Sequence, residues 1–473
     1  MGADQRRTPL ADAVDAFLAD ASITPFSTPG HKRSPELADP LLRLDLPLSA
    51  GADDLHLSGD VLGRAERLAA ELWGAELCLF CLNGSTQGNE ALALAAGVPG
   101  RTLIVSRNLH KSLLAGMVLA GLDPVWVRPG IDPSTGLPLG IPPARVADAL
   151  RAHPDACGVF LVEPNYVGAL SDLPAIARAC RDAGVPLLVD QAWGAYLGFH
   201  PSLPLHALAA GADAMVTSAH KTLTGFTQTA YLFARGDRLD LQRVRESFDA
   251  IHTTSPSAAM LASLDRARAL LAGRGQELLG RTLSLVARAR ERLAAIDGLG
   301  LPAGSPTAAF DPMKLVLALA GTGADGLAVE ADLYAAGIRV ELANRDTLVP
   351  LVTIADTEDS IDRLVRALAG SLGLRRATPR ASGAASAVWS VEPETAMTPR
   401  DAFFADRETV EAAAAVGRVC AETIVPYPPG IPAIAPGEIV TSELLDALRQ
   451  AGRDGTRIAY CADASLATVQ VVA

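Results

Sequence analysis

Residues 213–221 read Asp-Ala-Met-Val-Thr-Ser-Ala-His-Lys, an apolar run that ends in a cluster of polar groups around Lys221. Residues 185–190 read Val-Pro-Leu-Leu-Val-Asp, a second short apolar run that stops on the carboxylate of Asp190. Such runs are typical of buried parallel strands, and ligands of open α/β sheets lie at the carboxyl ends of the strands. We therefore expect Lys221 and Asp190 to leave neighbouring strands at the same edge of one sheet.

An amine and a carboxylate at one sheet edge suit a carbonyl cofactor. A deprotonated lysine can form an imine with it, and a carboxylate can hold the proton of a pyridinium ring, which makes the ring a better electron sink. We therefore expect Lys221 to hold pyridoxal 5'-phosphate (PLP) as a Schiff base and Asp190 to pair with its ring nitrogen. Taken alone, each could equally be a solvated side chain at a strand end, so the surrounding pattern decides.

A candidate anion site follows the strand predicted at 77–82. The chain continues as Asn83-Gly84-Ser85-Thr86-Gln87-Gly88-Asn89 and then as a helix from Glu90. Free backbone N–H groups and the positive dipole end of a helix favour an anion there, and the hydroxyls of Ser85 and Thr86 add donors. The motif is neither GxGxxG nor a Walker loop, so it does not imply a dinucleotide or a nucleoside triphosphate. The alternative is a plain helix cap.

A histidine stands at a second junction between a strand and a helix. The strand predicted at 102–106 leads into Arg107-Asn108-Leu109-His110-Lys111-Ser112 and then a helix. His110 could stack on a flat ring at this place. The alternative is an ordinary capping or surface histidine.

Strand and helix patterns alternate from about residue 77 to 235, which indicates a mainly parallel sheet with helices on both faces. Thr8 is expected to cap a helix over 8–20. The predicted strands and later helices are 77–82, 102–106, 123–127, 157–162, 185–190, 230–234, 314–319, 338–342 and 349–354, with helices at 257–297, 326–336 and 358–370. The expected division is an N-terminal arm (1–60), a large PLP-binding domain (61–255), a small α/β domain (256–373), a linker (374–395) and a C-terminal domain (396–473).

Composition narrows the classes of function. The net charge of −12 over 473 residues argues against a general binder of nucleic acid or anionic membranes. The six cysteines lie in apolar runs without metal-type spacing, so we expect buried thiols, no metal site and a reducing cytoplasm. No apolar core follows the N-terminal Met-Gly-Ala-Asp-Gln-Arg-Arg and no apolar stretch is long enough for a membrane span, so we expect neither a signal peptide nor a membrane anchor.

Along nearly its whole length the chain resembles the short form of the Orn/Lys/Arg decarboxylase family, which has the fold-type-I PLP architecture of the aspartate aminotransferase superfamily. Single motifs are weak, but six in the right order on the right elements are specific. The motifs are Thr8-Pro9-Leu10 with Pro29-Gly30-His31-Lys32, Asn83–Asn89, Arg107–Ser112, Asp190-Gln191-Ala192-Trp193-Gly194, Ser218-Ala219-His220-Lys221-Thr222, and Pro426–Pro432 with Pro436-Gly437-Glu438.

The resemblance implies a role for each matching residue. Lys221 would be the Schiff-base lysine and Asp190 the partner of the pyridine nitrogen. The other roles implied are phosphate binding by Gly84, Ser85, Thr86 and Ser218, ring stacking by His110, a place beside the lysine for His220, and a place at the cofactor's edge for Trp193. It also implies a homodimer or dimer-based oligomer with shared active sites.

The implied reaction is decarboxylation of a basic amino acid, arginine first and lysine or ornithine next, within polyamine biosynthesis. A long cationic side chain needs an acidic partner, for which Glu438, Asp53 and Asp54 are candidates. The chain departs from the family pattern at Gln191, Trp193 and the loop Glu163–Tyr166, which leaves the substrate open. Two alternatives also stay open: a PLP-dependent aminotransferase or lyase, and a non-catalytic PLP-fold regulatory protein. For the first, Arg339 and Arg345 are the possible carboxylate-binding arginines, but neither stands in a clear motif.

Overall fold

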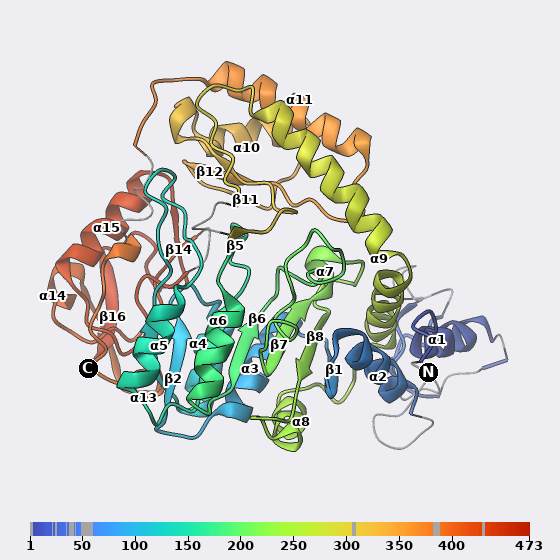
Figure 1. Cartoon of the computed structure of the whole chain (residues 1–473). Coiled ribbons are helices and arrows are strands. Elements are labelled where there is room, and N and C mark those ends of the chain that lie inside the picture. The colour runs from blue at the N-terminus through green and yellow to red at the C-terminus, as the bar shows by residue number, and fades with distance from the viewer. Residues whose placement is uncertain are drawn as a thin grey trace. The chain divides into compact units, whose positions relative to one another are not determined.

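The computed structural model describes residues 3–20, 22–23, 26–34, 36, 42, 44–48, 60–304, 309–381, 388–427 and 431–473. The chain forms two compact units, and Figure 1 labels most of their elements. The first unit comprises Met1–Ala96 and Pro186–Leu279, and the second comprises Gly97–Val185 and Gly280–Ala473. The five-part division expected from the sequence stays a prediction, because compactness alone groups the chain into two.

The first unit contains Asp190 and Lys221. Its helices and strands are α1 (Pro9–Ala19), α2 (Val61–Trp73), β1 (Leu77–Cys81), α3 (Gly84–Ala96), β6 (Leu187–Asp190), β7 (Ala214–Ser218), α7 (Ala219–Thr222), β8 (Ala230–Ala234) and α8 (Leu241–Ala250). The long helix α9 (Ala258–Leu293) contributes residues to both units. Among the described residues, no helix combines the length and apolarity needed to cross a bilayer.

The second unit contains the remaining elements. They are β2 (Thr102–Ser106), α4 (Lys111–Ala120), β3 (Asp123–Val127), α5 (Pro143–Ala152), β4 (Gly158–Val162), β5 (Ala169–Leu170), α6 (Leu173–Asp182), β9 (Ala309–Phe310), β10 (Leu317–Ala318), a 3-10 turn (Ala320–Thr322), α10 (Gly326–Ala335), β11 (Leu342–Ala343), β12 (Thr347–Val349), α11 (Glu358–Arg375), α13 (Pro399–Phe404), β13 (Arg407–Glu411), α14 (Ala412–Ala415), β14 (Val425–Tyr427), α15 (Ser442–Arg453), β15 (Arg457–Ala459) and β16 (Thr468–Val472).

Seven strands form one sheet in the order β1-β8-β7-β6-β4-β2-β3. The pairs β6–β7, β2–β4 and β2–β3 are parallel, whereas β8 runs antiparallel to β1 and β7. All residues of β1, β7 and β8 are buried, as expected for strands covered on both faces. The predicted mainly parallel α/β sheet is therefore confirmed.

Helix α3 begins at Gly84 rather than at the predicted Glu90. The glycine- and serine-rich stretch has weak helix propensity, so its sequence reads as a turn. Tertiary packing overrides that preference. A Cβ added at Gly88 would lie 2.6 Å from Val216 Cγ1, so α3 packs directly on β7 at a position where only glycine fits.

The start of α1 is capped by a residue that is distant in sequence. Thr8 is the N-cap as predicted, but its hydroxyl donates to Asp12 instead of accepting from the helix backbone. Asp265 on α9 accepts from the backbone N–H of Leu10 at 3.0 Å and of Ala11 at 3.3 Å. Arg268 pairs with Asp265 at 2.7 Å, and both side chains are fully buried.

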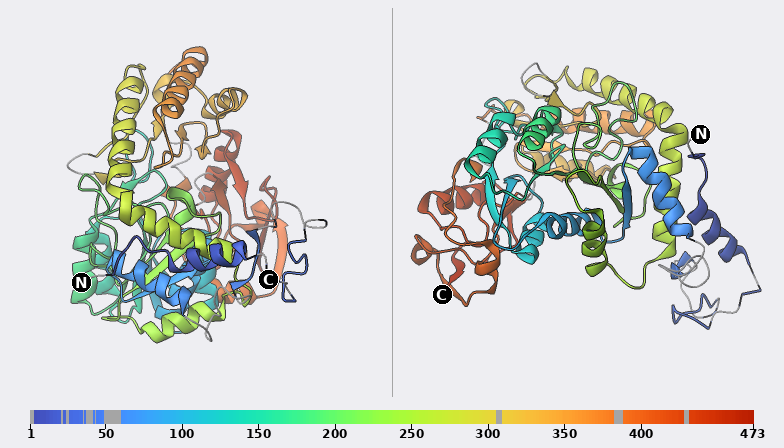
Figure 2. Two further views of the ribbon diagram at one scale, coloured as in Figure 1. Left: turned by 90° about the vertical axis from the view of Figure 1, so that its right-hand side faces the viewer. Right: turned by 60° about the horizontal axis from the view of Figure 1, so that its bottom comes forward.

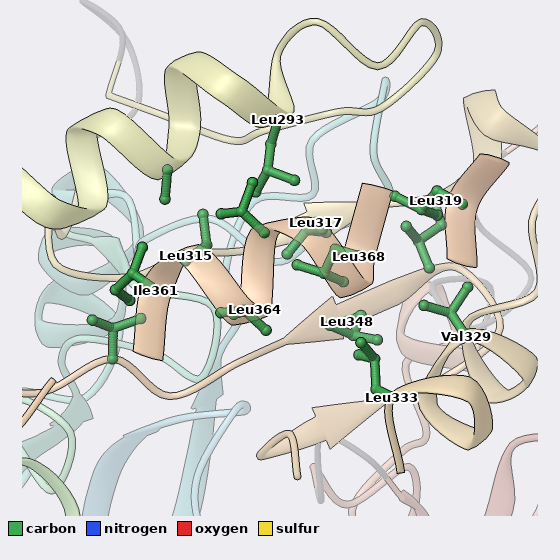
Figure 3. Packing of buried hydrophobic residues seen from close by; sticks show 14 of the residues in the cluster. Leu293, Leu315, Leu317, Leu319, Val329, Leu333, Leu348, Ile361, Leu364 and Leu368 are labelled. Atoms are coloured by element: carbon green, nitrogen blue, oxygen red, sulfur yellow. The ribbon is translucent and has the colours of Figure 1, made fainter. Parts of the chain in front are cut away.

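A separate apolar core lies between α9, α10, α11 and the strands β10, β12 and β11 (Figure 3). In Figure 3, Leu364 and Leu368 of α11 face Leu315 and Leu317. This core matches the small α/β pattern expected from the sequence. The strands are shorter than predicted: the stretches 338–342 and 349–354 supply only the ends of β11 and β12.

The C-terminal part of the second unit has its own core, which α15 and the pairs β13–β16 and β14–β15 enclose (Figure 2, orange to red). The predicted linker overlaps α11, which ends at Arg375. Arg380 within it is held at both ends of its guanidinium, by Asp346 at 2.7 Å and by the carbonyl of Gly323 at 2.8 Å.

Candidate active site

Strands β6 and β7 bring the predicted site residues to one edge of the sheet. They are parallel neighbours, and Asp190 is paired in register with Val216. β6 ends at Asp190 and β7 ends at Ser218, after which α7 carries His220 and Lys221 (Figure 1). The predicted placement of Asp190 and Lys221 at the carboxyl ends of neighbouring strands is confirmed.

The carboxylate of Asp190 is buried and oriented. Asn89 Nδ2 donates to Asp190 Oδ2 at 2.7 Å, and the backbone N–H of Ala192 donates to Oδ1 at 3.0 Å. Asp190 is 3% exposed and Asn89 is fully buried. Because an ionised carboxylate has about four acceptor sites, these two donors leave room for the proton of a ring nitrogen.

Gln191 fixes the turn that follows Asp190. Its Oε1 accepts from the backbone N–H of Ala207 at 2.8 Å, and its Nε2 donates to the carbonyl of Gly194 at 3.2 Å. Its own carbonyl accepts from Thr217 Oγ1 at 2.9 Å. The side chain is therefore engaged within the protein, and this departure from the family pattern supports the turn.

Trp193 lies beside Lys221. The Lys221 Nζ atom is 4.2 Å from the centroid of the Trp193 ring, and the Trp193 side chain is almost completely buried. An amine over an aromatic face is attracted to it when it carries a charge. The indole thus limits where the lysine amine can lie.

The start of α3 brings hydroxyl and backbone donors next to the end of β7. Ser85 Oγ and Ser218 Oγ are 2.7 Å apart and both residues are buried. The first residues of a helix leave backbone N–H groups without partners inside the helix, and Ser85 and Thr86 occupy this first turn. The N–H of Gly84 donates instead to the carbonyl of Gln228 at 2.6 Å. Gly84 therefore shapes the turn, with φ at +66°, a conformation in which side chains are strained.

His220 precedes the lysine and has a defined tautomer. Its Nδ1 lies 2.9 Å from the carbonyl of Thr229, which can only accept, so Nδ1 carries the proton and Nε2 is an acceptor in the neutral ring. Burial lowers the pKa of His220, and the positive charge of Lys221 adds to that shift, whereas the hydrogen bond to Thr229 opposes it. His220 is consequently a neutral group at neutral pH.

His110 lies in the second unit, whereas the other predicted catalytic and cofactor residues lie in the first. It is the N-cap of α4, where its Nδ1 accepts from the backbone N–H of Ser112 at 3.3 Å. The capping alternative for this residue is thus observed. Capping uses the ring edge, so the ring-stacking role stays a prediction.

Of the three acidic residues predicted as partners of a substrate cation, the structure describes only Glu438. Asp53 and Asp54 lie outside the described residues. Glu438 is 1% exposed and forms a buried pair with Arg107, whose Nη2 lies 2.9 Å from Glu438 Oε2. The backbone N–H of Ala435 donates to the same oxygen at 2.8 Å. Within this chain Glu438 is therefore committed to a structural ion pair.

The variant loop at Glu163–Tyr166 also has internal partners. The backbone N–H of Ser171 donates to Glu163 Oε1 at 2.7 Å, and the hydroxyl of Ser171 donates to Glu163 Oε2 at 2.8 Å. Asn165 donates to the carbonyl of Pro138 at 2.8 Å and accepts from the N–H of Ala169 at 2.9 Å. Both side chains fold the loop onto itself. Burial raises the pKa of Glu163 to about 8.

Asn89 is a site residue that was not predicted from the sequence. It lies four residues after Ser85, so a helix that starts at Gly84 places both side chains on one face. The signal was present in the spacing, but the helix was predicted to begin only at Glu90. Gln87 was missed as well: it accepts from the N–H of Leu82 at 3.2 Å and donates to His252 at 2.7 Å, which holds the turn in place.

The residues of the first unit fit PLP. A phosphate group suits the first turn of α3 with the paired hydroxyls of Ser85 and Ser218. A protonated ring nitrogen suits Asp190, and an aldehyde carbon suits the amine of Lys221. These three groups come from α3, β6 and the end of β7, which pack on one another.

Comparisons with known proteins point in the same direction. The model of the Orn/Lys/Arg decarboxylase major domain matches residues 8–301, and that of the C-terminal domain of the same family matches residues 382–454. The chain is 36% identical over 482 residues to a protein of Halalkalibacterium halodurans named arginine decarboxylase, covering 99% of this chain and 98% of that one. The arginine decarboxylase of Bacillus subtilis is 36% identical over 454 residues, which cover 93% and 92% of the two chains. The solved constitutive lysine decarboxylase of Escherichia coli has a TM-score of 0.81 at 24% identity, covering 99% of this chain and 82% of that one.

Proposed function

The chain belongs to the Orn/Lys/Arg decarboxylase family, and from this premise we propose that it is a PLP-dependent decarboxylase that releases CO2 from arginine. The observation that carries the proposal is the placement of Lys221 and Asp190 at the ends of two parallel neighbouring strands. PLP, when bound, supplies a conjugated ring that accepts the electron pair left at Cα when the carboxylate departs.

The chain's own residues would hold and orient that cofactor. Lys221 Nζ would attach it covalently, and the amine freed by the substrate would be positioned by Trp193 to move a proton. Asp190 would keep a proton on the ring nitrogen, with Asn89 orienting its Oδ2. Ser85, Thr86 and Ser218 would bind the phosphate, while Gly84 shapes the turn that presents them. His220, neutral and fixed on Thr229, would offer Nε2 as a hydrogen-bond acceptor.

Arginine is proposed ahead of lysine because of the full-length relatives. Two proteins named arginine decarboxylase are 36% identical to this chain and two more are 32% identical, whereas the solved constitutive lysine decarboxylase of Escherichia coli is 24% identical. We propose that the acidic partner of the guanidinium is a carboxylate other than Glu438 of the same chain, because Arg107 pairs with that carboxylate. We further propose a homodimer that acts in the cytoplasm in polyamine biosynthesis; six free cysteines agree with a reducing compartment.

A panel of amino acids tests the reaction and the substrate together. The purified protein is incubated with arginine, lysine, ornithine and an apolar amino acid, and both CO2 and keto acid are measured. We expect CO2 in equal amount to agmatine from arginine, with slower or no turnover of the others. Keto acid without CO2 would establish transamination instead, and no turnover of any amino acid by cofactor-loaded protein would favour the non-catalytic alternative.

The covalent attachment is tested separately. Borohydride reduction of the loaded protein should fix a cofactor adduct that mass spectrometry locates on the peptide containing Lys221. Lys221→Ala should lose that adduct and the visible absorbance of the bound cofactor. An adduct on a different lysine would overturn the assignment of Lys221 and leave the reaction to be judged by the panel.

A further inference from the structure

A small cavity of about 190 Å³ lies within the second unit, next to the carboxyl ends of β2 and β3. Three arginines line it. Arg107 follows β2, Arg128 follows β3, and Arg145 stands in the first turn of α5. This is the edge of a sheet at which α/β proteins bind ligands.

The cavity has more positive than negative side chains. Glu438 is already bound by Arg107 and by the backbone N–H of Ala435. Glu438 is not among the described lining residues, and the carboxylate in the lining is that of Glu392. Glu392 lies 3.1 Å from Arg128 Nε but its side chain is 72% exposed, so water screens its charge. The lining therefore contains three guanidinium groups, of which that of Arg145 is also exposed, and one solvated carboxylate.

Arg128 shows the consequence of this imbalance. Its side chain is only 14% exposed. Burial lowers the pKa of Arg128, and the neighbouring charges of Arg107 and Arg145 lower it further, whereas Glu392 and Glu438 oppose the shift. An anion in the cavity would add negative charge beside Arg128 and oppose this shift further, because the two glutamates leave the pKa of Arg128 below its usual value.

The three guanidinium groups are held in place before any ligand arrives. Arg107 lies 4.6 Å from the centroid of the Trp126 ring, and Arg128 Nη1 donates to the carbonyl of Trp389 at 2.9 Å. Arg145 Nη1 donates to the carbonyl of Arg128 at 2.8 Å. Binding would need little rearrangement, and arginine forks match oxyanions in two-point hydrogen bonds.

We propose that this cavity, lined by Arg107, Arg128 and Arg145, is a binding site for a small oxyanion, either a phosphate or a small dicarboxylate. Drug-sized ligands occupy pockets of about 300–1,000 Å³, so a space of this size suits a ligand of only a few heavy atoms. None of the described residues that line the cavity is one of the proposed cofactor residues. The site goes beyond the proposed reaction and does not depend on it.

Thermal unfolding of the cofactor-loaded protein tests the site. Inorganic phosphate or succinate is titrated at constant ionic strength maintained with potassium chloride. The loaded protein is used so that the cofactor, not the added anion, fills the phosphate-binding turn at Ser85. We expect a saturable rise in the melting temperature with at least one of the two anions; which one responds identifies the ligand class.

Two variants on one helix assign the effect to the cavity. Arg145→Gln removes a charge from the lining, and we expect the half-saturating anion concentration to increase about tenfold, as for loss of one charge-assisted hydrogen bond. Arg151→Gln removes the same charge from an exposed position on α5, where Arg151 pairs with Asp148, and should leave the titration unchanged. Equal titrations for the two variants, or no saturable rise in the unmodified protein, would overturn the site.

Discussion

Asn89 Nδ2 donates to Asp190 Oδ2 across 2.7 Å in a buried setting, and this contact joins helix α3 to strand β6. The two residues are 101 positions apart, so the hydrogen bond forms only when α3 is seated on the sheet. The residue proposed to hold the ring nitrogen is thus oriented by the same helix that is proposed to hold the phosphate. The proposed contacts to the ring nitrogen and to the phosphate of the cofactor therefore both depend on the position of α3.

Asn89→Ala should weaken the proposed reaction without abolishing covalent attachment to Lys221. A hydrogen bond to a charged group contributes about 1.5–3 kcal/mol, which corresponds to a loss of about 10- to 100-fold in kcat. The absorbance spectrum of the bound cofactor should shift with it, since the ring nitrogen loses a fixed partner. A variant with wild-type kcat and spectrum would show that Asn89 has only a packing role.

Trp193→Ala should lower cofactor affinity and stability together, whereas Trp193→Phe should retain much of both. The ring lies 4.2 Å from Lys221 Nζ, and phenylalanine preserves an aromatic face there. Truncation of a buried tryptophan to alanine costs about 3–5 kcal/mol. Cofactor titration and chemical unfolding of the two variants provide the measurements. Equal cofactor affinities of the two variants would show that the aromatic ring of Trp193 does not contribute to cofactor binding.

Arg268→Ala should destabilise the first unit by about 3–5 kcal/mol, because it leaves the carboxylate of Asp265 buried without its partner. Arg268 also donates to the carbonyls of Gln5 and Arg7, so the chain before α1 should become sensitive to proteolysis. The matched control is Arg266→Ala. Arg266 pairs with Asp15 at the surface and should contribute only about 0–1 kcal/mol. Similar unfolding free energies for the two variants would contradict the buried clamp.

Glu163→Gln should become progressively more stable than the wild type as the pH rises. The pKa of Glu163 is raised from about 4.5 to about 8 by burial, so the folded protein binds a proton that the unfolded chain releases. That contribution is complete below about pH 4.5 and is lost as the pH rises through about 8. Melting temperatures measured from pH 5 to 9 check the trend, with the exposed Glu291→Gln as control. A constant difference across this range would argue against the raised pKa.

Glu438→Gln should lower stability and leave the KM for arginine unchanged. The substitution removes the charge that balances the buried Arg107, for which a loss of about 3–5 kcal/mol is expected. Unfolding experiments and steady-state kinetics at a temperature at which the variant stays folded make the comparison. The reverse pattern, a KM raised tenfold or more at wild-type stability, would restore Glu438 as the partner of the substrate cation.

The buried strands are the part of the fold that the sequence predicts best. The bounds of β2, β3 and β8 agree with the expected ranges 102–106, 123–127 and 230–234. Short apolar runs between turn residues carry this information locally. The early start of α3 and the cap on α1 could not be predicted in this way, because Val216 and Asp265 act on them from distant parts of the chain.

The same distinction applies to the site. Lys221 and Asp190 were predictable because each ends a strand and because strands of one parallel sheet end at a common edge. The roles of Gln191 and Asn165 could not be predicted. The sequence around a polar loop residue is the same whether its side chain binds a ligand or forms hydrogen bonds within the loop. Their partners Ala207 and Pro138 are 16 and 27 positions away in the chain, respectively.

The close approach of α3 to β7 at Gly88 restricts which substitutions can be accepted there during evolution. Positions 88 and 216 share one fixed volume, so any side chain at position 88 requires a residue smaller than valine at position 216. A single substitution at position 88 would displace Ser85, Thr86 and Asn89 together, since all three are on the same rigid helix. Relatives that carry a side chain at position 88 should therefore have a residue smaller than valine at position 216.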